Sequence, residues 1–173
     1  MKKALFLDRD GVVCEVLAPE VFLVNLEQFK LRNGIQELVR VVKNKGYTVV
    51  VVTSQPQLAM GMLTLKELQA IHEHMRKALK EAIDGIYVCP HDRSGSCACR
   101  KPKPGLLLQA AKDLNIDLAQ SIFVGDRHKD VLAGQAAGCK TVLVKSEHWP
   151  DELMYCKPDM FADRLTNVIP LLI

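Results

Sequence analysis

The chain has 173 residues, of which 49% are hydrophobic and 25% are charged. We expect residues 1–173 to form a single domain, because this length is sufficient for one compact unit with a full hydrophobic core. The net charge of +3 is too small to indicate a nucleic-acid or membrane surface. One local basic cluster at Arg100, Lys101 and Lys103 leaves anionic small molecules as plausible ligands.

Short apolar segments alternate with helical patterns along the chain. In chain order, strands are predicted at residues 4–7, 47–53, 86–89, 122–124 and 141–144. Helices are predicted at 35–42, after a capping box at Thr64 and Glu67, from about 104 to 114, at 130–137, and in a last stretch from Asp163.

Apolar strands separated by helices predict a parallel sheet that is covered on both faces. The expected fold class is therefore α/β, a Rossmann-like three-layer α/β/α sandwich. In such folds ligands bind at the carboxyl ends of the strands.

The N-terminal segment does not predict export. Its apolar run after Lys2 and Lys3 ends after four residues at Asp8, which is too short for a signal peptide. The most apolar internal run, residues 49–52, is far shorter than the roughly 20 residues of a membrane-spanning helix. We predict a cytoplasmic protein without membrane partners.

Polar side chains gather where the predicted strands end. Asp8 and Asp10 follow the first strand, and their spacing puts both carboxylates on one side of the extended backbone. The other candidates are Thr53 and Ser54 at the second strand, Lys101 between the third and fourth strands, and Asp126 after the fourth strand. Carboxylates, a hydroxyl group and a cation are suited to binding a divalent metal together with a phosphate.

The same residues make the chain resemble the haloacid dehalogenase-like (HAD) phosphatases. Four signatures occur in the family's order and span nearly the whole chain: FLDRDG at 6–11, VVTS at 51–54, RKP at 100–102, and VGD at 124–126 followed by Asp130. Asp130 either supports a metal or begins the following helix, and both interpretations remain open.

The resemblance implies a role for each residue. Asp8 is the expected nucleophile, which forms an aspartyl-phosphate, and Asp10 is the expected proton donor and acceptor. Mg²⁺ would be bound by Asp8, the backbone carbonyl of Asp10, and Asp126. Lys101 and Thr53 would stabilise the transferring phosphoryl group.

A second motif consists of four soft metal ligands in a loop at about 89–99: Cys89, His91, Cys97 and Cys99. Four protein ligands can complete a tetrahedral site and leave no open position for catalysis, so the loop predicts a structural Zn²⁺. Because Cys99 directly precedes Arg100 and Lys101, this zinc would hold the phosphate-binding residues in place.

The zinc loop narrows the resemblance to a subgroup of small phosphatases without a large cap domain. This subgroup includes the heptose 1,7-bisphosphate 7-phosphatases and the histidinol-phosphatases, and it implies an open site. Ser54, Arg100 and Arg127 are the expected substrate-binding residues. Substrate choice is expected to depend on the loops 14–25 and 55–62 and on the zinc loop.

Segments 85–91 and 100–105 favour the heptose phosphatases. Residues 125–127 and the spacing between His91 and Cys97 suit the histidinol-phosphatases at least as well, so histidinol phosphate or another small sugar phosphate remains an alternative. A small phosphorylated metabolite is the expected partner, and the chain is expected to be a monomer.

A different class of function is a zinc-loop module that binds nucleic acid or protein without enzymatic activity. The chain offers no basic helix with interleaved aromatic residues, and this absence disfavours nucleic-acid binding.

Several other reactive side chains are interpreted as structural. His72 and His74 point to different faces of a predicted helix, and we expect them on a solvated face. His128 is expected in an exposed loop, and Trp149 as a packing anchor near the edge of the sheet. The cysteines outside the zinc loop are expected to be small packing residues: Cys14, Cys139 and Cys156.

Overall fold

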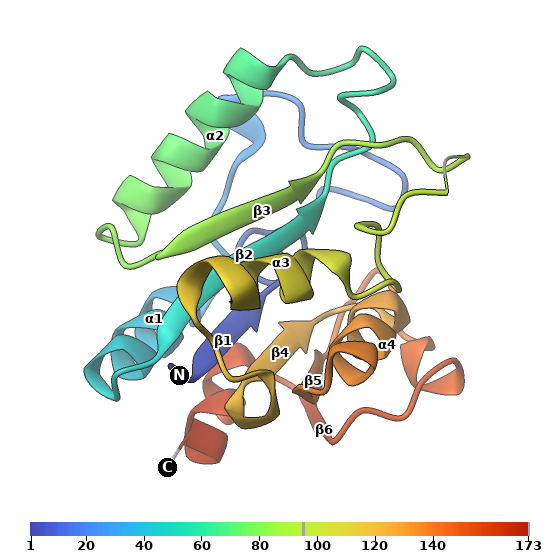
Figure 1. The fold of residues 1–173 in the computed structure, drawn as a ribbon. Helices are drawn as coiled ribbons and strands as arrows, with labels where there is room; N and C mark the ends of the chain where they lie inside the picture. The colour runs from blue at the N-terminus through green and yellow to red at the C-terminus, as the bar shows by residue number, and fades with distance from the viewer. Residues whose placement is uncertain (95, 173) are drawn as a thin grey trace.

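The computed structural model describes residues 1–94 and 96–172, which form a parallel sheet of six strands in the order β3-β2-β1-β4-β5-β6 (Figure 1). The strands are β1 (Ala4–Leu7), β2 (Thr48–Ser54), β3 (Gly85–Cys89), β4 (Ile122–Gly125), β5 (Lys140–Val144) and β6 (Met160–Ala162).

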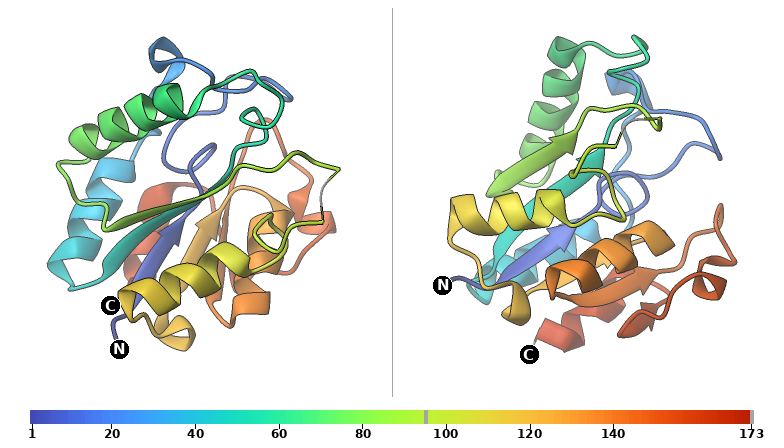
Figure 2. Two further views of the ribbon diagram at one scale, coloured as in Figure 1. Left: turned by 45° about the horizontal axis from the view of Figure 1, so that its top comes forward. Right: turned by 45° about the vertical axis from the view of Figure 1, so that its right-hand side comes forward.

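Helices cover both faces of this sheet. The α-helices are α1 (Ile35–Asn44), α2 (Leu65–Ala78), α3 (Gly105–Leu114) and α4 (His128–Ala137). The 3-10 helices are η1 (Leu26–Gln28), η2 (Leu118–Gln120), η3 (Glu152–Met154) and η4 (Leu165–Leu172). Buried side chains of α1, η4 and the end of α2 pack on one face, and those of α3 and α4 on the other (Figure 2). The prediction of a three-layer α/β/α fold is confirmed.

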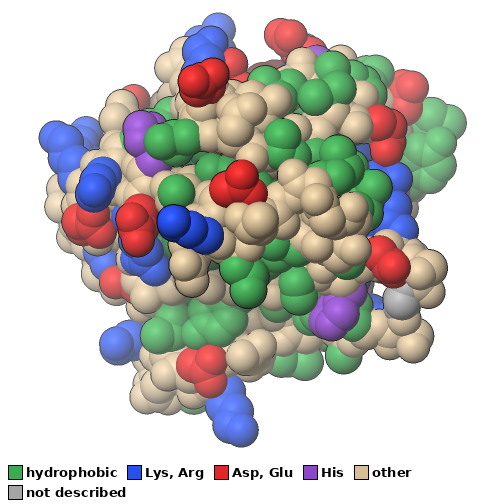
Figure 3. Space-filling view, turned by 90° about the horizontal axis from the view of Figure 1, so that it is seen from above, with side chains coloured by type: hydrophobic (Ala, Val, Ile, Leu, Met, Phe, Trp, Pro, Cys, Tyr) green, Lys and Arg blue, Asp and Glu red, His purple; other side chains and the backbone are tan. Residues whose placement is uncertain are grey.

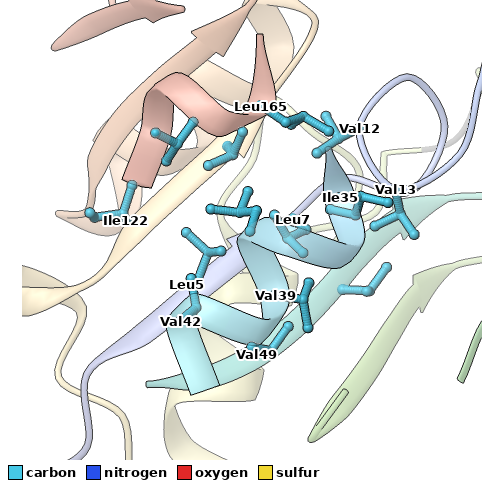
Figure 4. Packing of buried hydrophobic residues seen from close by; sticks show 14 of the residues in the cluster. Leu5, Leu7, Val12, Val13, Ile35, Val39, Val42, Val49, Ile122 and Leu165 are labelled. Carbon is cyan, nitrogen blue, oxygen red and sulfur yellow. The ribbon is translucent and has the colours of Figure 1, made fainter. Parts of the chain in front are cut away.

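Successive side chains of β1 point to opposite faces of the sheet, so both faces need a layer of helices. Leu5 and Leu7 point into the core under α1, where they meet Val39 and Val42 (Figure 4). Phe6 belongs to the opposite core, under α3 and α4. Each fully buried side chain of this kind stabilises the fold by about 1.5–3 kcal/mol relative to an exposed one.

The register of the parallel strands brings their carboxyl ends to one edge of the sheet. Leu7 pairs with Val51 on one side and with Val124 on the other, and Ser54 pairs with Cys89. The residues that follow these positions therefore lie close together above the sheet.

The C-terminal segment differs from the sequence prediction. The last helical stretch is a 3-10 helix that begins at Leu165 and contains Pro170, which has no backbone N–H to donate. Strand β6 was not predicted, since three residues are too few to show an alternation. Helix α4 begins at His128, two residues before the predicted start.

None of the helices in the described part of the chain is long and apolar enough to cross a bilayer. On the face seen in Figure 3, acidic and basic side chains are interspersed among hydrophobic ones.

Candidate active site

Asp8 lies directly after β1 and is held by two neighbours. Its Oδ1 accepts a hydrogen bond from the backbone N–H of Arg9 at 2.8 Å and forms an ion pair with Lys101 Nζ at 2.8 Å. Lys101 is buried and also pairs with Asp130 Oδ1 at 2.6 Å. No described residue donates a hydrogen bond to Asp8 Oδ2, so this oxygen remains available to a ligand.

Burial governs the proton equilibria of this group of charges. It raises the pKa of Asp8 to about 7, because the loss of solvation and the repulsion by Asp130 outweigh the attraction of Lys101. Burial would lower the pKa of Lys101, but the charges of Asp130 and Asp8 raise it above its usual value, so Lys101 stays protonated.

Asp126 follows β4, and its surroundings are suited to binding a cation. Both of its carboxylate oxygens are buried, and neither has a hydrogen-bond partner among the described residues. Carboxylate oxygens of Asp8, Asp126 and Asp130 lie within 4.8 Å of one another. Burial, followed by the charges of Asp130 and Asp8, raises the pKa of Asp126 well above its usual value. Oxygen ligands of this kind suit Mg²⁺.

Gly11 makes room for this cluster. A Cβ atom at this position would lie 2.1 Å from Asp126 Oδ2, and the backbone φ of +91° is one that glycine adopts most readily. Asp130 also caps the start of α4, since its Oδ2 accepts the backbone N–H of Arg127 at 3.0 Å. The two interpretations of Asp130 left open by the sequence are therefore compatible with each other.

Asp10 is held by a buried arginine that the sequence analysis did not single out. Arg9 Nε and an Arg9 terminal nitrogen donate to the two Asp10 oxygens at 2.9 and 3.0 Å, and Gln55 Nε2 donates to Oδ2 at 3.0 Å. Burial would raise the pKa of Asp10, but the Arg9 charge and these hydrogen bonds lower it.

The prediction for His72 was wrong. Its Nε2 lies 3.4 Å from an Arg9 terminal nitrogen, and the residue is half-buried, so it faces this network and does not lie on a fully solvated face. Burial and the nearby Arg9 charge lower the pKa of His72 to about 4. A neutral imidazole can accept a hydrogen bond from Arg9, and the contact is not visible in a sequence because the two residues lie 63 positions apart.

Thr53 and Ser54, at the end of β2, both border the candidate site. Thr53 Oγ1 accepts a hydrogen bond from Gln55 Nε2 at 2.7 Å, so one amide group connects Thr53 with Asp10. The Ser54 hydroxyl oxygen is buried, and no residue in the described part of the chain forms a hydrogen bond with it. It is therefore free to contact a ligand.

The four predicted zinc ligands converge at the end of β3. Cys89 Sγ lies 3.6 Å from both His91 Nδ1 and Cys97 Sγ, and His91 Nδ1 lies 3.2 Å from Cys99 Sγ. All four ligand atoms lie within 4.8 Å of one another. Zn–S distances of about 2.3 Å in a tetrahedron require sulfur atoms about 3.7 Å apart, so the donor set fits zinc.

The thiols of the cluster differ in acidity, since burial and the neighbouring Cys89 and Cys97 raise the pKa of Cys99 to about 12. Burial opposes ionisation of Cys97, but hydrogen bonds from the Arg100 backbone and the neighbouring thiols lower its pKa to about 6. The thiolate is the form that binds metals.

The zinc loop packs directly against the segment that carries Lys101. Arg100 donates a hydrogen bond to the His91 carbonyl, and Lys103 Nζ donates to the Cys97 carbonyl at 2.8 Å. A Cβ atom at Gly105 would lie only 2.3 Å from the Ala98 carbonyl oxygen, which shows how closely α3 approaches the loop.

A cavity of about 260 Å³ opens above Asp8. Its basic side chains are Arg93, Arg100, Lys101, Arg127 and Lys129. One wall is formed by the segment 15–18 and 20–23. The loop 55–62 contributes none of the described residues that line this cavity. Gln57 of this loop is buried, and its Nε2 contacts the Leu23 carbonyl at 3.4 Å.

The expectation for His128 is corrected, whereas Trp149 packs as expected, on a residue of the cavity. Trp149 lines the cavity and packs on the Arg127 guanidinium, whose carbon lies 3.7 Å from the ring centroid. His128 is half-buried at the start of α4 and pairs with Glu152. Neither contact follows a sequence periodicity, because both join segments that are distant in the chain.

Known proteins are similar to this chain in both sequence and fold. A family model described as HAD-hydrolase-like matches residues 98–168. The D-glycero-beta-D-manno-heptose-1,7-bisphosphate 7-phosphatase of Haemophilus ducreyi is 38% identical, covering 98% of this chain and 97% of the relative. The protein of the same name from Helicobacter pylori is 39% identical, over 90% of this chain and 92% of the relative.

Solved structures show the same likeness. The D,D-heptose 1,7-bisphosphate phosphatase of B. bronchiseptica, solved with magnesium and phosphate, matches with a TM-score of 0.89 and 32% identity over 98% of this chain and 97% of that one. An HAD-like phosphatase structure from Mesorhizobium loti matches with a TM-score of 0.83 and 27% identity, over 99% of this chain and 86% of that one.

Proposed function

The chain belongs to the HAD-like hydrolases, in the family of the heptose-1,7-bisphosphate 7-phosphatases, and we propose that it removes the 7-phosphate of D-glycero-D-manno-heptose 1,7-bisphosphate. The observation that supports this proposal best is the cavity above Asp8. Its floor combines a free carboxylate oxygen with the buried Lys101 cation, and further basic side chains line it.

Magnesium fits the cluster of Asp8, Asp126 and Asp130, whose oxygens are close together and lack sufficient positive charge. We propose that Asp8, the Asp10 backbone carbonyl and Asp126 hold it. When bound, the ion supplies positive charge beside the phosphate and favours the ionised form of Asp8.

In the first step, Asp8 Oδ2 attacks phosphorus, the bond from phosphorus to the sugar oxygen breaks, and an aspartyl-phosphate forms. Oδ2 is proposed for the attack because Oδ1 is engaged by Lys101 and by the Arg9 N–H. Lys101 and the Thr53 hydroxyl are positioned to stabilise the charge on the transferring phosphoryl group.

Asp10 is proposed to enter this step in its protonated form and to donate that proton to the leaving sugar oxygen. In the second step it accepts a proton from the water that hydrolyses the aspartyl-phosphate. The Arg9 pairing favours the ionised form of Asp10, which is the form that accepts this proton.

Substrate recognition is proposed for Ser54, Arg100 and Arg127, all of which line the cavity. Arg100 and Arg127 are the basic side chains proposed to bind a second phosphate of the substrate. Zinc is proposed as the structural metal of the loop 89–99, where it would hold Arg100 and Lys101 in place.

Initial rates of phosphate release from heptose 1,7-bisphosphate, histidinol phosphate and p-nitrophenyl phosphate test the substrate. We expect the highest kcat/KM with the heptose bisphosphate, and a higher value with histidinol phosphate would contradict the proposal. Asp8→Asn is expected to lower turnover at least about 10³-fold. Asp84→Asn, at an exposed acid outside the site, is the matched control.

We further propose that residues 1–173 act as one domain and as a monomer. Light scattering coupled to gel filtration should then give a mass near 19.3 kDa.

A further inference from the structure

Arg127 is held by two side chains from a distant part of the chain. It lies between β4 and α4, directly after Asp126, whereas Trp149 and Glu152 belong to the segment that connects β5 with β6. Arg127 Nε donates a hydrogen bond to Glu152 Oε1 at 2.8 Å. The guanidinium carbon of Arg127 lies over the Trp149 ring, 3.7 Å from the ring centroid.

Glu152 is itself fixed. Its side chain is only 9% exposed, and its Oε2 accepts hydrogen bonds from the backbone N–H of His128 and from His128 Nδ1, the latter at 2.6 Å. Burial would raise the pKa of Glu152, but these hydrogen bonds and the Arg127 charge lower it, so the carboxylate stays ionised. His128 Nδ1 therefore acts as a donor.

These contacts engage one edge and one face of the guanidinium. Neither terminal nitrogen of Arg127 donates to any residue that the structure describes, and both Arg127 and Trp149 line the cavity above Asp8. An arginine side chain carries about 2 kcal/mol of rotamer entropy, which a flexible residue would lose on binding a ligand. A guanidinium that is already held in place avoids most of this loss.

We propose that Trp149 and Glu152 are positioning residues, which hold Arg127 so that its terminal nitrogens are presented to the substrate. This inference rests on the proposed function, in which Arg127 contacts the substrate. It adds that substrate affinity depends on the segment between β5 and β6, although Glu152 does not line the cavity.

A double-mutant cycle tests the inference. In Glu152→Gln and in Trp149→Ala, KM for heptose 1,7-bisphosphate should rise about 10-fold with kcat nearly unchanged, because the chemistry at Asp8 is untouched. In an Arg127→Ala background the same substitutions should have almost no further effect. Asp151→Asn, at the adjacent exposed acid, and His148→Ala are the matched controls and should leave KM unchanged.

If Glu152→Gln and Trp149→Ala raise KM as much without Arg127 as with it, or do not raise it at all, the inference is wrong. Circular dichroism establishes that each variant is folded, and Trp149→Ala provides the test if Glu152→Gln unfolds. Failure of wild-type protein to hydrolyse heptose bisphosphate would refute the proposed substrate alone. The cycle would then be measured with fructose 1,6-bisphosphate, and the same two outcomes would decide the inference.

Discussion

Replacing Asp126 with asparagine is expected to stabilise the magnesium-free protein while abolishing its activity. The Asp126 carboxylate is buried and lies close to Asp8 and Asp130, and its two oxygens accept no hydrogen bond from residues 1–94 or 96–172. Asparagine has the same shape and fits beside Gly11, but it carries no charge. A residue that is proposed to bind the metal therefore destabilises the protein when the metal is absent.

The magnitude follows from the spacing of the charges. Two unit charges 4.8 Å apart repel by about 3 kcal/mol at an effective dielectric constant of about 20. Asp126 experiences two such repulsions, from Asp130 and Asp8, which are offset by attraction to Lys101 and Arg32. Protonation of Asp126 reduces the cost further. A net gain of about 2 kcal/mol is expected, which corresponds to a rise in Tm of about 4–8 °C for a chain of this length.

The gain should depend on pH with a defined sign. The folded-state pKa values of Asp8 and Asp126 are raised, so their protonated forms favour folding at low pH and this contribution is lost as the pH rises through the folded-state values. With the pKa of Asp8 at about 7, the difference between Asp126→Asn and wild type should be small at pH 5 and largest at pH 8.

Thermal unfolding followed by circular dichroism, in magnesium-free buffer with one equivalent of zinc, measures this difference. Saturating magnesium should raise the Tm of the wild type and not that of the variant, which reverses their order. Asp151→Asn, at an exposed position, serves as the control for loss of one negative charge. A Tm of Asp126→Asn at or below the wild-type value at pH 8 without magnesium would refute the reasoning.

Three further outcomes are expected. Gly11→Ala should weaken magnesium binding at least about 10-fold by calorimetry, since its Cβ would displace the Asp126 carboxylate, whereas Gly61→Ala has a similar positive φ with open space around it and should leave binding unchanged. Cys97→Ser should reduce the zinc content measured by mass spectrometry and lower the Tm, whereas Cys139→Ser should leave the zinc content at one per chain. Lys101→Met should lower kcat about 10²–10³-fold in the phosphate-release assay, and an unchanged kcat would exclude Lys101 from stabilising the transferring phosphoryl group.

The sequence predicted the location of the candidate site because that location follows from strand ends. Asp8, Thr53 and Asp126 each follow or close an apolar run, and parallel strands bring such positions to one edge of the sheet. The zinc ligands could be predicted for a similar reason, since a segment of only 11 residues, from Cys89 to Cys99, contains all four of them. The roles of these residues remain proposals.

The contacts that were missed join segments with no local signal. His72 reaches Arg9 from α2, and Glu152 reaches Arg127 from the connection after β5. Each contact depends on how two distant elements pack against each other. This packing cannot be inferred from residue types or from hydrophobic periodicity. Strand β6 was not predicted for another reason. It is defined by its pairing with β5, and its own sequence shows no strand pattern.

The buried guanidinium of Arg9 changes how mutants of Asp10 have to be interpreted. Arg9 is 0% exposed, so a variant such as Asp10→Ala leaves a buried charge with fewer partners. The expected cost is about 2 kcal/mol, below the range for fully buried pairs, because the Asp10 side chain is 36% exposed to the cavity. Low yield and low activity would then share one cause, and Asp10→Asn, whose amide oxygen can still accept from Arg9, separates folding from proton transfer.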